Sequence, residues 1–240
     1  MKKKYNHTVE KHNLLSPNNI VPVIIELIEP KSVIDIGCGL GTFLRVFKEN
    51  GVQKVLGIDG PWVKKELLFQ NIDENEFIET EIEKPLEVEN KFDLLVCLEV
   101  AEHLSPQRGE TIVSDLCKLS DVILFSAAIP FQGGDHHYNE QWISYWENKF
   151  KKEGYIKRDI LKPIFWANED VFWWYKQNMV IFTKPEFKFK SNMKLVENTL
   201  TNIIHPELFL TVVDYKEKNA VKRYTRALFK ALMFKLGFIK

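Results

Sequence analysis

The chain has 240 residues, 45% hydrophobic and 28% charged, a length and composition that suit a folded domain with a sizeable core and exclude a disordered chain. Its 33 basic and 33 acidic residues cancel, which argues against non-specific nucleic-acid binding by the whole chain. The three cysteines are scattered, no apolar run approaches the roughly 20 residues that span a bilayer, and no apolar segment follows the basic start. These features predict a cytoplasmic protein.

Short apolar runs alternate with helical segments from residue 30 onward. The runs that we predict to be strands are Ser32–Ile36, Lys54–Ile58, Glu76–Ile78, Phe92–Leu98 and Val122–Ala127. The segments that we predict to be helices are Gly41–Asn50 and Gln107–Lys118. Strands that are apolar on both faces and alternate with helices indicate a parallel sheet that is covered on both sides.

Three glycines follow the first predicted strand at every second position. They are Gly37, Gly39 and Gly41, whereas the dinucleotide-binding fingerprint would place its third glycine at Thr42. A strand that ends in glycines and leads into a helix presents backbone N–H groups to a polar ligand. Asp59, which ends the second strand 20 residues after Gly39, is placed to accept hydrogen bonds from ribose hydroxyls. The alternative is that the glycines serve only a tight turn, and Asp59 only a helix cap.

The pattern D-x-G-x-G-x-G, with an acidic residue ending the next strand, resembles class I S-adenosylmethionine-dependent methyltransferases. The resemblance implies a Rossmann-like α/β fold, with helices flanking a mostly parallel sheet whose last strand is antiparallel. It also implies S-adenosylmethionine as cofactor and S-adenosylhomocysteine as product. The cofactor-binding residues that it implies are Asp35, Gly37, Cys38, Gly39, Gly41, Asp59, Gly60, Glu81, Ile82, Leu98 and Glu99.

The resemblance gives these residues different roles. The glycines would border the methionine part of the cofactor, and Asp35 would position its ammonium group. Asp59 would hold the ribose, Glu81 and Ile82 would touch the adenine ring, and Glu99 would close the methionine side. His103, in the same stretch as Glu99, is either a packed helix residue or a catalytic base. Cys38 is expected to be a small buried side chain rather than a nucleophile.

Polar side chains crowd into the segment that follows the strand Val122–Ala127. They are Asp135, His136, His137, Asn139 and Glu140. An imidazole suits proton removal near neutral pH, and a neighbouring carboxylate can orient it. We therefore predict catalysis by His137 as base, with Glu140 and His136 as further candidates, although these side chains could equally cap and orient the loop.

The loop pattern H-x-N-E-Q-W-x-x-Y-W resembles small bacterial methyltransferases found among surface-polysaccharide enzymes. The resemblance implies acceptor binding by His12, Asn13, Asn139, Trp142 and Tyr175. The tryptophan-rich stretches could instead belong to the core. A divalent metal held by Asp135, His136, His137 and Glu140 is possible but not favoured, so no metal is predicted.

The predicted activity is methyl transfer to a hydroxyl oxygen of a small carbohydrate-related acceptor in surface-polysaccharide biosynthesis, for instance capsule or lipopolysaccharide. The acceptor would be a small, nucleotide-linked or lipid-linked molecule, and no nucleic acid is expected. Two alternatives stay open. The acceptor could be a phosphoryl or phosphoramidate oxygen of a capsule decoration, or the chain could be an inactive cofactor-binding partner subunit.

The chain becomes basic near its end. Residues 186–240 hold 11 lysines and arginines against 5 acids, which leaves the rest acidic overall. We predict a methyltransferase domain with an N-terminal helix over residues 1–185 and a mostly helical, basic appendage over residues 186–240. The stretch Ala220–Lys240 has the pattern of a basic amphipathic helix. It would pack on its own domain, contact a second subunit, or lie on an anionic membrane surface.

Overall fold

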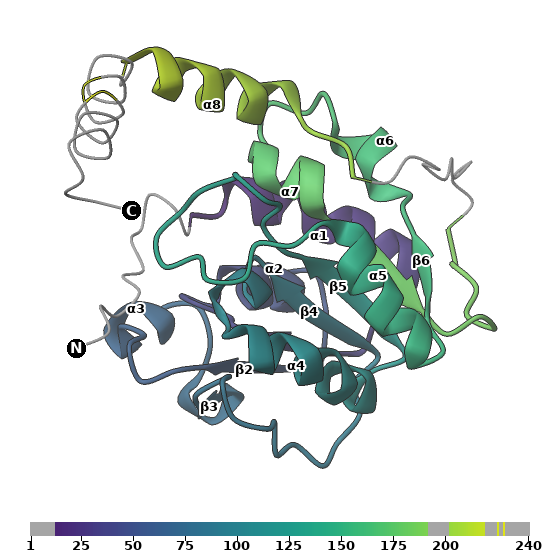
Figure 1. Ribbon diagram of the computed structural model, residues 1–240. Coiled ribbons are helices and arrows are strands. Elements are labelled where there is room, and N and C mark those ends of the chain that lie inside the picture. Colours follow the sequence, from purple (N-terminus) through teal and green to yellow (C-terminus); the bar gives the residue numbers. More distant parts are fainter. Residues whose placement is uncertain (1–12, 192–201, 219–224, 226–227, 229–240) are drawn as a thin grey trace. The chain divides into compact units, whose positions relative to one another are not determined.

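A computed structural model of the chain describes residues 13–191, 202–218, 225 and 228 (Figure 1). Residues 1–203 form one compact unit and residues 204–240 a second. The stretch Ala220–Lys240, which we predict to be amphipathic, lies almost wholly outside the described residues, as does His12. No helix in the described part of the chain is long and apolar enough to cross a membrane.

Seven strands form one sheet in the first unit. They are β1 (Ser32–Ile36), β2 (Lys54–Asp59), β3 (Phe77–Glu79), β4 (Leu94–Leu98), β5 (Val122–Ser126), β6 (Ile156–Arg158) and β7 (Val180–Thr183). Their spatial order is β3-β2-β1-β4-β5-β7-β6. The first five pair in parallel, whereas β7 runs antiparallel to both β5 and β6. The expected mostly parallel sheet with an antiparallel last strand is confirmed.

Helices connect and cover these strands. Those of the first unit are α1 (Leu15–Ile28), α2 (Thr42–Glu49), α3 (Lys65–Leu68), α4 (Pro106–Leu119), α5 (Ile143–Lys152), α6 (Leu161–Phe165) and α7 (Trp173–Asn178). Two short 3-10 turns, η1 (Glu74–Glu76) and η2 (Ala101–His103), precede β3 and follow β4. In the second unit, α8 spans Pro206–Lys218.

Helix boundaries follow local chemistry. α4 begins where Ser105 accepts a hydrogen bond from the backbone N–H of Arg108 at 3.2 Å, with Pro106 in the first turn. α2 begins after Gly41, whose φ of 72° lies in the left-handed region. The sequence predicted α2, α4 and the strands β1 to β5 to within two residues at each end, whereas no bounds were predicted for β6 and β7.

Two apolar clusters lie on opposite faces of the sheet. Neighbouring strand residues alternate between them: Val33 joins the cluster of α1, α2 and α6, and Ile34 joins that of α4 and α5. The same alternation separates Val96 from Cys97 in β4. The strands read as continuous apolar runs because helices bury both faces. Because β1, β2 and β4 run parallel, their carboxyl ends meet at one edge of the sheet, where ligands bind in folds of this kind.

Candidate active site

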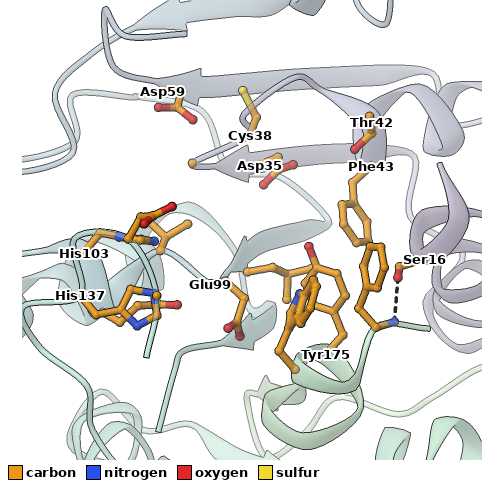
Figure 2. Close-up of a pocket in the computed structure, with 18 of the residues that line it drawn as sticks. Ser16, Asp35, Cys38, Thr42, Phe43, Asp59, Glu99, His103, His137 and Tyr175 are labelled. Atoms are coloured by element: carbon orange, nitrogen blue, oxygen red, sulfur yellow. Dashed lines mark hydrogen bonds between the residues drawn. The ribbon is translucent and has the colours of Figure 1, made fainter. Parts of the chain in front are cut away.

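A cavity of about 370 Å³ opens at this edge of the sheet. Asp35 of β1, Asp59 of β2 and Leu98 of β4 line one part of it, and His137 and Tyr175 line another. Figure 2 shows the two aspartates at the strand ends, the histidines His103 and His137 side by side, and the ring of Tyr175 across from them. The cavity thus joins residues that are 140 positions apart in the chain.

The glycine loop forms the floor of the cavity. The backbone N–H groups of Gly37 and Cys38 both donate to the carbonyl oxygen of Ile58, at 2.7 and 3.2 Å, which fixes the loop to β2. Gly37 has a φ of 80°, and a Cβ there would lie 2.3 Å from a methyl group of Val100. Only glycine fits this position, so the backbone stays accessible to a ligand. Gly37 and Cys38 line the cavity, with Cys38 largely buried, as expected.

Asp59 holds the loop as well as facing the cavity. One carboxylate oxygen accepts from the N–H of Gly39 at 2.8 Å, and the other from the N–H of Gly60 at 2.6 Å. Burial raises the pKa of Asp59 to about 6, although hydrogen bonds from Gly39, Gly60 and Trp62 oppose the rise. Gly39 and Gly60, implied as cofactor residues, therefore contact this carboxylate, while Trp62 lines the cavity beside it.

Asp35 is a buried carboxylate with 4% exposure that also lines the cavity. Burial, and next the charge of Asp59, raise the pKa of Asp35 to about 8. A cationic ligand would relieve this unfavourable ionisation. The edge formed by Asp35, Asp59 and the glycine backbone therefore suits a ligand that carries an ammonium group and neighbouring hydroxyls.

The two residues implied to contact the adenine ring differ in their surroundings in the structure. Ile82 is buried and lines the cavity, but Glu81 does not. Glu81 is exposed and lies 3.5 Å from the ammonium group of Lys84. The neighbouring acid Glu83 lines the cavity instead and accepts hydrogen bonds from the backbone N–H and hydroxyl of Ser105.

Glu99, which is labelled in Figure 2, is hydrogen-bonded to side-chain amides from two other segments. Its carboxylate accepts from the side chain of Gln132 at 2.9 Å and from that of Asn178 at 3.1 Å. Burial raises the pKa of Glu99, and the hydrogen bond from Asn178 is the main opposing cause. The network ties the end of β4 to α7, because Asn178 ends that helix.

Three side chains form what we call the polar corner of the cavity: Glu102, His103 and His137. Nδ1 of His137 lies 2.9 Å from Glu140, and Nδ1 of His103 lies 3.2 Å from the carbonyl oxygen of His136. Burial, together with the neighbouring His137, lowers the pKa of His103 to about 4. Burial also raises the pKa of Glu102 well above its ordinary value, and the charge of Glu99 adds to the rise.

Several predicted site residues lie outside the cavity lining. The carboxylate of Glu140 accepts the backbone N–H groups of Phe131 and Gly133, both at 2.8 Å, so it orients the loop and His137. The ring of His136 lies beside that of Tyr138. Asn139 is buried, with its side-chain oxygen bonded to Gln141. Gly41 and Trp142 precede α2 and α5, and they too are absent from the lining.

Aromatic side chains close the remaining side of the cavity. Four of them form the aromatic wall: Phe172, Trp173, Trp174 and Tyr175. The ring of Tyr175 meets that of Phe43 edge-on, with centroids 5.7 Å apart. The hydroxyl of Ser16, a fully buried residue, accepts the backbone N–H of Phe172 at 3.0 Å and ties the wall to α1. Asn13, a predicted acceptor residue, also lines the cavity.

The sequence did not identify Glu102, Ser16, Phe43 or Trp62 as site residues. Glu102 had the clearest signal, because it precedes His103 directly beyond a buried strand that ends at the ligand edge. Phe43 and Ser16 lie on apolar helix faces and look like core residues in the sequence.

Comparison with known proteins identifies the family of this chain. A family model described as "Methyltransferase domain" matches residues 9–162. A ubiquinone biosynthesis O-methyltransferase of Dictyostelium discoideum is 29% identical over 141 residues, which cover 52% of this chain and 40% of that protein. The chain thus matches less than half of that relative's length.

Solved structures share the fold. An amino pentose methyltransferase from Micromonospora echinaspora, with S-adenosylmethionine bound, superposes with a TM-score of 0.56 at 10% identity. The match covers 77% of this chain and 100% of that one. A magnesium protoporphyrin IX methyltransferase from Synechocystis, with S-adenosylhomocysteine bound, gives 0.51 at 14% identity, covering 76% and 90%.

Proposed function

We propose, from the premise that this chain belongs to the family of methyltransferase domains, that it methylates a hydroxyl oxygen of a small carbohydrate-related acceptor. The protein is an S-adenosylmethionine-dependent methyltransferase, and S-adenosylhomocysteine is its product. The name of the Dictyostelium relative, an O-methyltransferase, supports an oxygen acceptor. The loop pattern from His137 to Trp146 supports an acceptor from surface-polysaccharide biosynthesis, in nucleotide-linked or lipid-linked form.

The residues at the strand ends fit this cofactor. Bound S-adenosylmethionine supplies a methyl group that its positive sulfur activates for transfer. Asp35 would meet the ammonium group, since a buried carboxylate with a raised pKa favours a cationic partner. Asp59 would hold the ribose hydroxyls, and Ile82 would give the adenine ring an apolar neighbour.

The opposite side of the cavity would receive the acceptor. Methyl transfer depends chiefly on holding the acceptor oxygen in line with the bond that breaks. The aromatic wall offers faces on which a ring-shaped acceptor can pack. With a proton on Nδ1, toward Glu140, His137 would have a lone pair on Nε2 that can take the hydroxyl proton.

One observation carries the proposal: a single cavity is lined by Asp35 and Asp59 on one side and by His137 and Tyr175 on the other. The first test is calorimetric titration with S-adenosylmethionine and S-adenosylhomocysteine. We expect binding by the wild type and weakening by about 1–3 kcal/mol in Asp59→Asn, because a buried hydrogen-bond acceptor is altered. Asp121→Asn, an exposed carboxylate that pairs with Lys91, is the control. No binding by the wild type would overturn the proposal.

A second test concerns the acceptor. Incubation with methyl-labelled cofactor would compare hydroxyl-bearing sugar nucleotides with phosphoramidate-bearing ones. His137→Ala should bind the cofactor normally and lose turnover with a hydroxyl acceptor. Near-normal turnover in this variant would contradict proton removal by His137 and favour an acceptor oxygen that is already ionised. Cofactor binding without turnover on any acceptor would indicate an inactive partner subunit.

A further inference from the structure

We propose that the polar corner, Glu102, His103 and His137, binds one divalent transition-metal cation. Each of the three residues offers a ligand atom, and these atoms lie within 4.8 Å of one another. Glu102 and His103 come from η2, directly after β4, whereas His137 comes from the loop between β5 and α5. Three ligands from two separate segments are enough to hold a metal and leave positions open toward the cavity.

Glu102 supplies the strongest indication. It has 0% exposure, yet neither carboxylate oxygen accepts a hydrogen bond of good geometry from the described residues. A buried carboxylate without such partners is costly, and buried charges are normally paired or bound to metals. Its side chain lines the same cavity as the two imidazoles. The neighbours of this carboxylate include the backbone N–H of Ala128 and the carboxyl group of Glu99, neither of which carries a positive charge. A cation at the polar corner would supply that charge.

The two imidazoles are oriented as metal ligands usually are. Nδ1 of His137 faces the carboxylate of Glu140 at 2.9 Å, and Nδ1 of His103 faces the carbonyl oxygen of His136 at 3.2 Å. Both partners are acceptors, so a proton on each Nδ1 would complete these hydrogen bonds and leave a lone pair on each Nε2 for a cation. Metal-bound histidines typically donate their second nitrogen to a carboxylate or a backbone carbonyl in this way.

Backbone bonds hold the two segments in register. The carbonyl oxygen of Glu102 accepts the N–H groups of Tyr138 and Asn139, at 2.8 and 2.9 Å. The rings of His103 and His137 lie edge-to-face with centroids 4.8 Å apart. The ligand set is therefore assembled before any cation arrives, which favours binding.

The donor set determines the kind of cation. Two imidazole nitrogens and one carboxylate suit zinc, iron, cobalt or nickel, whereas magnesium and calcium prefer oxygen ligands. The role of such a cation rests on the proposed function: it would hold the acceptor oxygen opposite the cofactor. In the metal-bound protein, the lone pair of His137 would bind the cation instead of a proton. The cation would then acidify the bound acceptor hydroxyl, so that its proton leaves to solvent before methyl transfer.

The test uses cobalt(II) as the probe, on the full chain without cofactor or acceptor. Equilibrium dialysis with metal analysis would give stoichiometry and affinity, and visible absorption would report nitrogen ligands. We expect one cobalt per chain in the wild type and at least roughly 10-fold weaker binding in Glu102→Gln and in His137→Ala. His136→Asn is the matched control, because it removes the adjacent imidazole, keeps the carbonyl that His103 faces, and tolerates the positive φ of 63°.

The outcomes test the metal site and the methyltransferase assignment independently of each other. Circular dichroism and calorimetry with S-adenosylmethionine would show that each variant is folded. A folded wild type that binds the cofactor but no cobalt would overturn the metal site and leave the methyltransferase function intact. Equal cobalt binding in all variants, or equal loss in His136→Asn, would also overturn it. Cobalt binding without cofactor binding would support the metal site and contradict the proposed function.

Discussion

Oε1 of Glu140 lies 2.9 Å from Nδ1 of His137, and the same carboxylate accepts the backbone N–H groups of Phe131 and Gly133. One carboxylate therefore sets both the shape of the loop and the tautomer of the imidazole. The next experiment tests whether these bonds of Glu140 matter for turnover.

Replacing Glu140 by glutamine removes one of these acceptors, because Oε1 accepts from Gly133 and lies beside His137 while Oε2 accepts from Phe131. An amide nitrogen in place of Oε1 would donate to Nδ1 and shift the imidazole proton to Nε2, whereas one in place of Oε2 would face the N–H of Phe131 and loosen the loop that holds His137. We expect a loss of turnover of roughly 10–100-fold with cofactor affinity unchanged, measured by steady-state kinetics and calorimetry. Glu147→Gln, which alters a glutamate that pairs with Lys157 on α5, is the control. Equal rates for the two variants would mean that the bonds made by Glu140 do not limit turnover.

Gly134 is packed against the imidazole of His137. A Cβ at this position would lie 2.3 Å from Nε2, so Gly134→Ala must displace the ring or the loop. Gly133→Ala is a matched control, because Gly133 also has a positive φ but its Cβ would meet nothing within 4 Å. We expect Gly134→Ala to lose most of its turnover, and Gly133→Ala to show mainly the cost of backbone strain in thermal unfolding. Comparable turnover would show that the position of the ring is not limiting.

Asp35 should make the stability of the cofactor-free protein depend on pH. Its pKa is about 8 in the fold, whereas an unperturbed aspartate titrates near 3.9. Between these values the folded state binds more protons than the unfolded state, so stability falls as pH rises through this window. The melting temperature of Asp35→Asn minus that of the wild type should therefore increase from pH 5 to about pH 8 and stay constant above it. A constant difference would contradict the raised pKa, and Asp121→Asn is the control.

The hydrogen bond between Ser16 and Phe172 should stabilise the aromatic wall. Ser16→Ala leaves a backbone N–H without its acceptor in a partly buried position, at a cost of about 1 kcal/mol. Denaturant unfolding should show this loss, and the apparent KM for the acceptor should rise while cofactor affinity stays the same. Ser191→Ala, which removes a surface hydroxyl bonded to Glu26, should change neither. An unchanged acceptor KM in Ser16→Ala would mean that the wall does not contact the acceptor.

The fold could be predicted closely because the strands are apolar on both faces and glycines mark their ends. The glycine loop and Asp59 could be predicted for the same reason. The loop follows the end of the first strand and Asp59 ends the second, so their spacing in the sequence follows from the positions of these strands. The polar corner could not be predicted from the sequence. It forms because the carbonyl oxygen of Glu102 accepts the backbone N–H groups of Tyr138 and Asn139, which brings two distant segments together. Glu140 was expected to be catalytic, yet its contacts are those of a residue that positions the loop.

The antiparallel direction of β7 has a consequence for how this protein can diversify. Because β7 starts beside the carboxyl end of β5, the chain returns to the ligand edge once more, and α7 arrives there with its aromatic residues. The segment that would contact the acceptor is thus encoded far downstream of the glycine loop. If the aromatic wall contacts the acceptor as proposed, substitutions in α7 would alter acceptor choice while the proposed donor half of the cavity stays constant, so that specificity and methyl-donor use would evolve independently.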